Sequence, residues 1–293
     1  MATTVLGAFD KFRQNLQITD LQTATVSRRQ NSIRDFLSEE FCVTSSFLAG
    51  SYRRSTLIAP LSQADVDIFI VLDPCHFSRA PTAPANLLAS VKKKLSAFFT
   101  PYTRTPDVSR NGQAVTVTYS EFSMDIVPCF NREGGGYIIP DGIDNQWIST
   151  DPYRHLQIWS ETNTAKDGKF IPLVKMIKAW NKKHSSYLRS FHLETLVLYS
   201  IRYRTITDYQ TAVRDVFGDI RTSFLAPVWD PAQYGGNIGD YISQINGLQN
   251  LENWLQIAYD QAVKAIEYDR AGYPADAIRC WKNIFHEYFP AYG

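Results

Sequence analysis

The spacing of hydrophobic and polar residues changes about halfway along the chain. In the first half, residues 64–72 form a largely apolar run typical of a buried strand, and residues 114–119 and 122–127 alternate between apolar and polar. Residues 20–41 and 87–99 instead repeat apolar side chains every three to four positions, as amphipathic helices do. The first half is therefore predicted to be a mixed α/β region, in which residues 114–119 and 122–127 form a hairpin.

The second half has the period of helices. Apolar side chains recur at helical spacing over residues 173–180, 193–201, 248–266 and 275–289. Pro172 suits the first turn of a helix, whereas residues 141–164 are rich in turn-forming residues and are predicted to be a loop between two lobes. We predict an α+β fold with a mixed-sheet catalytic lobe over residues 1–150. A helical lobe over residues 151–293 follows, and the N-terminal helix returns to it.

Composition and charge narrow the class of protein. The chain has 293 residues, enough for a large core, with 44% hydrophobic and 20% charged residues and no low-complexity tract. Its formal net charge of +1 gives no overall basic field, so we do not expect it to bind long nucleic acid. The four cysteines lack the spacing of zinc sites, and we find neither a signal peptide nor an apolar run of the roughly 20 residues that span a bilayer. We expect a soluble, cytoplasmic protein with no membrane partner.

Two acids interrupt the most apolar strand. Asp65 and Asp67 are two positions apart, so both side chains leave the same face of the strand. Two like charges held side by side in apolar surroundings cost free energy unless positive charge lies between them. A divalent cation with oxygen ligands is the simplest such partner. The pair alone is weak evidence, because an aspartate at the end of a strand is ordinarily a turn or cap residue.

Two further features strengthen the case for a metal site. Gly50 and Ser51 form a turn upstream of the acidic strand, where a backbone without a side chain can approach phosphates closely. A third acid, Asp125, lies in the alternating strand 122–127. Three acids and a Gly-Ser turn suit nucleotidyl transfer, which needs a clamp on the triphosphate and two metal ions rather than covalent catalysis. We expect two Mg²⁺ ions at Asp65, Asp67 and Asp125, with Mn²⁺ as an alternative.

These motifs together resemble a known family. Residues 50–58 followed by Asp65 and Asp67, the lysine-bearing segment 173–181 and residues 190–194 are similar to the bacterial cGAS/DncV-like nucleotidyltransferases, the synthases of CBASS antiphage signalling. That family belongs to the polymerase β-like nucleotidyltransferase superfamily. The resemblance covers nearly the whole chain. It implies a two-lobed fold that binds NTPs between the lobes and makes a cyclic di- or trinucleotide second messenger with release of pyrophosphate.

The resemblance also assigns roles to individual residues of the helical lobe. Lys178 matches the lysine that contacts the triphosphate, and Lys175 shares its helix face. Ser190 resembles a residue that adds a hydroxyl contact to the phosphates. Phe191 resembles the aromatic residue on which the donor base stacks, although without the resemblance it would be interpreted as a core residue. Single helix lysines are ordinarily solvated, so these roles depend on the family match.

Partners and alternative functions complete the expectations. The substrates are NTPs, ATP and/or GTP among them, and a separate effector protein is expected to bind the product. The terminal Gly293 is compatible with conjugation by a ubiquitin-transfer-like partner, which is weak evidence. One alternative is a nucleotidyltransferase that modifies RNA or protein, which needs an open acceptor face. The other is a catalytically silent nucleotide-binding scaffold, which has no reason to keep three mutually repelling acids.

Overall fold

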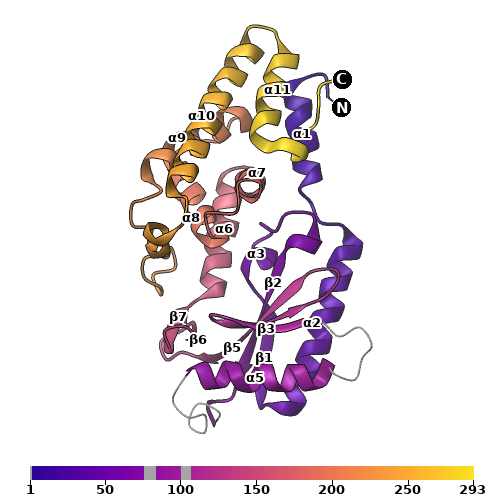
Figure 1. Ribbon diagram of the computed structural model, residues 1–293, viewed down its shortest axis with the longest axis vertical. Helices are drawn as coiled ribbons and strands as arrows, with labels where there is room; N and C mark the ends of the chain where they lie inside the picture. Colours follow the sequence, from indigo (N-terminus) through magenta and orange to yellow (C-terminus); the bar gives the residue numbers. More distant parts are fainter. Residues whose placement is uncertain (1, 76–83, 100–106) are drawn as a thin grey trace. The chain divides into compact units, whose positions relative to one another are not determined.

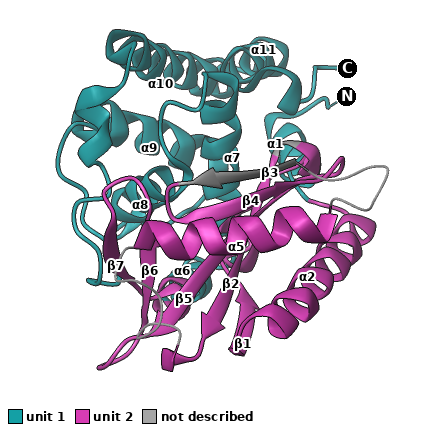
Figure 2. Ribbon diagram, turned by 60° about the horizontal axis from the view of Figure 1, so that its bottom comes forward, with its two compact units in different colours: residues 1–17, 158–293 teal, residues 18–157 magenta. Residues whose placement is uncertain are grey.

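The computed structural model describes residues 2–75, 84–99 and 107–293, and these fold into two compact units (Figure 2). The sheet unit comprises residues 18–157, and the helical unit comprises residues 1–17 and 158–293. The expected division after residue 150 thus lies at residue 157 instead, because helix α6 (Pro152–Ala165) supplies residues to both units.

The sheet unit is built on a mixed sheet (Figure 1). Its elements are α2 (Asp20–Glu40), β1 (Val43–Leu48), α3 (Gly50–Arg53), β2 (Asp65–Leu72), α5 (Pro84–Phe99), β3 (Asp107–Asn111), β4 (Ala114–Thr118), β5 (Ser123–Asn131), β6 (Tyr137–Asp141) and β7 (Gln146–Thr150). The strand order is β1-β2-β5-β4-β3, with β6 beside β5 and β7 beside β6. The pairing of β2 with β5 is parallel, and the other pairs are antiparallel. The α+β class and the β4–β5 hairpin are confirmed.

The strand β2 contributes to apolar clusters on both faces of the sheet. Val66, Ile68 and Ile70 belong to the larger cluster, which α2 and α5 cover. Phe69 and Val71 point the other way, into a smaller cluster formed with residues of β4 and β5. Burial on both faces explains the nearly continuous apolar sequence of this strand. Its two acids are therefore exceptions at the start of an otherwise buried strand.

The helical unit gathers helices from both ends of the chain. Its elements are α1 (Val5–Asn15), most of α6, α7 (Phe170–Lys183), α8 (Ser190–Ile201), α9 (Tyr209–Ser223), α10 (Leu248–Arg270) and α11 (Pro274–Phe285). Phe12 of α1 packs on Phe285 and Phe289, with ring centroids 4.6 and 5.3 Å apart, and Phe9 contacts Trp281 at 5.0 Å. These rings attach the N-terminal helix to the C-terminal one. Over the described parts of the chain, no helix is both long and apolar enough to cross a bilayer.

One predicted loop is wrong. Residues 141–164 contain the strand β7 and most of the helix α6. The turn-forming residues in this segment begin the helix: the carboxylate of Asp151 accepts the backbone N–H of Arg154 at 2.9 Å, and Pro152 is the first helical residue. Asp and Pro are favoured at helix N-termini as well as in turns, so composition alone did not separate the two cases.

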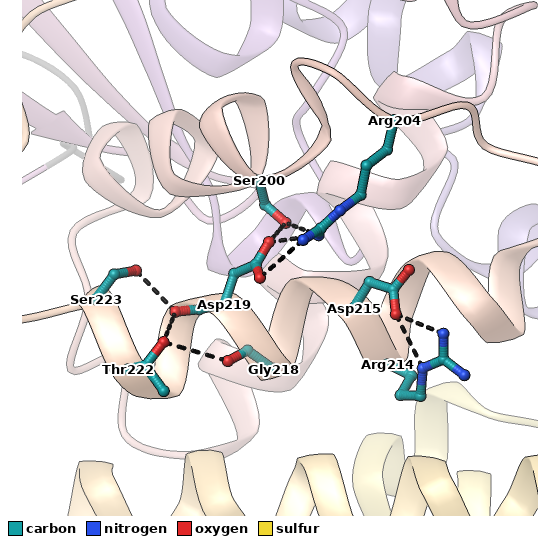
Figure 3. A network of polar contacts seen from close by, with 8 residues as sticks. All are labelled: Ser200, Arg204, Arg214, Asp215, Gly218, Asp219, Thr222 and Ser223. Carbon is teal, nitrogen blue, oxygen red and sulfur yellow. Dashed lines mark hydrogen bonds and ion pairs between the residues drawn. The ribbon is translucent and has the colours of Figure 1, made fainter.

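A polar network joins α8 to α9 (Figure 3). Ser200 donates a hydrogen bond to one oxygen of Asp219 at 2.6 Å, and Arg204 donates to the other at 3.0 Å. The Arg204 and Asp219 side chains are both substantially exposed, so water screens their attraction. The network therefore fixes how the two helices align more than it stabilises the unit.

The aromatic attachment of α1 predicts a stability difference between two positions on one helix. Phe12→Ala removes a fully buried ring and should lower the free energy of unfolding by about 3–5 kcal/mol. Leu6→Ala, at a site that is 71% exposed, should change it by less than about 0.5 kcal/mol. Urea unfolding of both variants checks this. Equal losses would show that the Phe12 contacts do not hold α1 in place.

Candidate active site

The parallel pairing of β2 with β5 brings the three predicted acids together. Asp67 is the direct register partner of Asp125, and Asp65 is that of Ser123. Partners in a parallel pair project to the same face, and neighbouring strands are about 4.8 Å apart. All three carboxylates therefore leave one face of two adjacent strands. The sequence could identify the acids as candidates, but not this pairing between strands about 60 residues apart.

Asp125 has a hydrogen-bond donor that the sequence analysis did not single out. Thr116 lies opposite it in the antiparallel β4–β5 pair, and its hydroxyl donates to Asp125 Oδ1 at 2.5 Å. Burial raises the pKa of Asp125, and this hydrogen bond lowers it. Burial disfavours the charged form of the carboxylate. A cation beside Asp125 would therefore lower the free energy of its ionised form. The sequence signal that could have indicated Thr116 is its polar side chain in the alternating segment 114–119.

Gly50 lies directly against Asp67. It has a φ of +56°, and a Cβ at this position would be 1.6 Å from Asp67 Oδ2. The backbone N–H of Ala49 donates to the carbonyl oxygen of Asp67 at 2.9 Å. Only glycine fits both the backbone conformation and the space. Ser51 follows in the first turn of α3, where amide N–H groups have no acceptor within the helix.

The acids offer the right ligand chemistry for a hard divalent cation, but not a closed cage. Carboxylate oxygens are the preferred protein ligands of Mg²⁺. Across residues 2–75, 84–99 and 107–293, no three His, Cys, Asp or Glu side chains are grouped so that they could hold a metal ion by themselves. Mg²⁺ commonly binds through one or two carboxylates and completes its shell with water and substrate phosphates. The site therefore fits ions that arrive with a nucleotide.

The two predicted lysines of the helical unit have different surroundings. Lys178 is buried and forms an ion pair with the fully buried Glu194, at 2.8 Å. Lys175 is also buried, and its ammonium donates to the neutral side-chain oxygen of Gln17 at 2.7 Å. Burial, and secondly the charge of Lys178, lower the pKa of Lys175 to about 8. The positive charge of Lys175 is thus compensated less than that of Lys178.

The other two predicted residues begin helix α8. Ser190 is exposed at the first position of the helix. Phe191 is half-buried, and its ring stacks on Trp159 with centroids 5.9 Å apart and planes 23° from parallel. Trp159 and Glu194 were both missed from the sequence. Glu194 lay within the family-like segment 190–194, but no role was assigned to it there.

Comparisons with known proteins identify the family of the chain. A family profile described as the Second Messenger Oligonucleotide or Dinucleotide Synthetase domain matches residues 3–163, which is more than half of the chain. A probable cyclic nucleotide synthase of Bacillus cereus (strain VD146) is 28% identical over 276 residues, covering 83% of this chain and 81% of that protein. The cyclic AMP-AMP-AMP synthase of an Acinetobacter strain is 27% identical over 309 residues, covering 98% and 86%. The solved structure of Escherichia coli MS115-1 CdnC with ATP superposes with a TM-score of 0.74, at 17% identity, over 98% of this chain and 99% of that one.

The contact between Gly50 and Asp67 predicts the outcome of a matched pair of substitutions. Gly112 lies in the same unit with a φ of +48°, and its nearest neighbouring atom is 3.7 Å from a Cβ built there. Gly112→Ala should therefore cost only the backbone strain of about 1–2 kcal/mol. Gly50→Ala should cost about 1–3 kcal/mol more, because the methyl group must displace the Asp67 carboxylate.

Urea unfolding measures the stability difference, and assays of the expected nucleotidyl transfer test its consequence. Gly112→Ala should retain turnover and Gly50→Ala should lose it. A Gly50→Ala enzyme with both the stability and the turnover of Gly112→Ala would contradict the contact described here.

Proposed function

Because the chain belongs to the Second Messenger Oligonucleotide or Dinucleotide Synthetase family, we propose that Asp65, Asp67 and Asp125 are the residues at which it joins nucleoside triphosphates. The protein is a nucleotidyltransferase that makes cyclic oligonucleotides. The single observation that supports this assignment of the site is the register pairing of Asp67 with Asp125. That pairing supplies a set of carboxylates suited to ions carried in by a triphosphate.

Each group of the sheet unit has a distinct task in this proposal. The three aspartates hold divalent cations, Mg²⁺ in the first instance, which when bound neutralise charge on the transferring phosphoryl group and acidify the attacking hydroxyl. Thr116 keeps the Asp125 carboxylate oriented. Gly50 leaves room for the Asp67 carboxylate, and the backbone amides at Ser51 donate to phosphate oxygens. Catalysis then consists mainly of positioning and charge stabilisation.

The helical unit contributes contacts to the nucleotide. We assign phosphate binding first to Lys175, whose buried charge is balanced by a neutral amide, and secondly to Lys178, whose charge Glu194 already compensates. Ser190 adds a hydroxyl at the start of α8. Phe191, whose ring stacks on Trp159, is the residue that we assign to stacking on the donor base, as the family resemblance implies.

The names of relatives support a narrower statement about substrate and product. One relative is a cyclic AMP-AMP-AMP synthase, and the structure of CdnC contains ATP. We propose that ATP is among the substrates and that the product is a cyclic di- or trinucleotide. It would act as a second messenger in antiphage defence by binding a separate effector protein.

Incubation of the purified protein with labelled NTPs and Mg²⁺ tests the reaction and the site together. The wild type should release pyrophosphate and form a small phosphatase-resistant product without added RNA or protein. Asp67→Asn should lower turnover by roughly 10²-fold or more, because it removes a charge from the metal site.

Asp73→Asn is the matched control for this experiment. Asp73 lies just after β2 at the same strand parity as Asp67, but its carboxylate accepts the backbone N–H of Cys75 at 2.8 Å. Its substitution should leave turnover unchanged. Product that requires a macromolecular acceptor would favour the RNA- or protein-modifying alternative. Equal turnover in Asp67→Asn and the wild type would refute the assignment of the acids.

The buried charge of Lys175 predicts a pH dependence of nucleotide binding. The pKa of this ammonium is lowered to about 8, so its charge is present below that pH and is lost as the pH rises through it. The KM for NTPs should therefore increase above pH 8 in the wild type. Lys175→Arg stays charged and should flatten this increase, whereas Lys183→Arg, at an exposed site on the same helix, should preserve it. Steady-state kinetics from pH 7 to 9.5 measure both, and a wild-type increase retained in Lys175→Arg would contradict the phosphate role.

A further inference from the structure

A stack of aromatic rings rises from the sheet face that carries the acids. Phe69 is two positions after Asp67 on β2 and shares its face, at about 7 Å along the strand. Phe47 is the register partner of Phe69 on β1, and the two rings stack with centroids 5.3 Å apart and planes 23° from parallel. The stack therefore begins next to the acidic positions, on the same side of the sheet.

Tyr153, in the first turn of α6, continues the stack outward. Its ring centroid is 4.7 Å from that of Phe47, at an interplanar angle of 38°. Tyr137 of β6 closes one side, 5.3 Å from Phe47 and 6.3 Å from Tyr153. Exposure increases along the stack, from 7% at Phe69 to 49% at Tyr153. All four rings belong to the sheet unit.

Core packing accounts for the inner rings but not for the outer one. Phe69 lies within the smaller apolar cluster, against which Phe47 and Tyr137 pack. Tyr153 does not need to anchor the start of α6, because Asp151 already caps this helix through the N–H of Arg154. What remains is a half-exposed ring at the outer end of a row of contacting rings that starts two positions from Asp67. An aromatic ring in this setting is a stacking surface for another planar group.

We propose that Tyr153 is the stacking surface for the base of the acceptor nucleotide, the one whose ribose hydroxyl lies at Asp65, Asp67 and Asp125. This inference rests on the proposed function, because it takes the acids as the reacting end of the site. Phe47 and Tyr137 are positioning residues, because their rings contact the Tyr153 ring and fix its orientation. Stacking recognises the face that every base has, so this contact supports more than one base at the acceptor position.

The first experiment compares substitutions of the ring. Tyr153→Phe keeps the stacking surface and should keep the wild-type KM for ATP, whereas Tyr153→Leu should raise it by about tenfold, the loss of one stacked base. Phe98→Leu is the control: it removes a ring from the Phe36–Phe98 stack (4.1 Å), which packs on the opposite face of the sheet. It should leave the KM unchanged. Thermal unfolding of each variant confirms that the fold is retained.

The second experiment removes the base instead of the ring. AMP carries a base and a ribose but no pyrophosphate leaving group, so it can react only as the acceptor, and ribose 5-phosphate is the same molecule without its base. Each compound is therefore compared with ATP as an acceptor, by the yield of the linear product in which it has accepted an adenylyl group from ATP. In the wild type, AMP should compete with ATP about tenfold better than ribose 5-phosphate does. In Tyr153→Leu the two compounds should compete equally, because the interaction requires both partners.

The outcomes separate this inference from the function on which it rests. A wild-type enzyme that releases no pyrophosphate from NTPs refutes the proposed function. Normal turnover together with an AMP advantage that persists in Tyr153→Leu overturns the stacking role of Tyr153. So does normal turnover in which AMP competes no better than ribose 5-phosphate with the wild type.

Discussion

The parallel pairing of β2 with β5 is the constraint on which the rest of the sheet unit depends. It places Asp67 beside Asp125, with Asp65 on the same face, at the start of strands that are otherwise apolar. Like charges in such a position are unfavourable, and burial alone already disfavours ionisation of Asp125. The apolar residues further along both strands stabilise a pairing that the acids by themselves would oppose. The sheet thus holds carboxylates in a geometry that cations improve.

The helical unit shows the opposite electrostatic arrangement. Lys175 and Lys178 are both buried on α7, yet a single carboxylate, that of Glu194, forms an ion pair with Lys178, and the neutral amide of Gln17 accepts from Lys175. A buried charge with a neutral partner is disfavoured, which explains the lowered pKa of Lys175. The two units therefore carry charge imbalances of opposite sign.

In our interpretation, the strand β2 carries both the catalytic acids and the first ring of the base-binding stack. The acids occupy the first positions of β2, and Phe69, one step further on the same face, begins the aromatic stack that ends at Tyr153. The hydrogen bond from Thr116 to Asp125 and the close packing of Gly50 against Asp67 give the reacting end a defined geometry. A stacked ring defines a plane but not the identity of a base. This arrangement suits an enzyme that must position the reacting groups of its substrate accurately but can accept more than one base.

The sequence by itself determined the local elements and the identity of the acids, because periods of two and of 3.6 residues and the glycine before Ser51 are properties of short segments. It also indicated Asp65, Asp67 and Asp125 as a set. The tertiary structure alone decided which residues meet across long separations: Thr116 with Asp125, and Phe12 with the last helix. A local pattern records which face of an element is buried, but not which partner buries it. Residues 141–164 were predicted to be a loop because Asp151 and Pro152 are residue types that occur both in turns and at the start of helices.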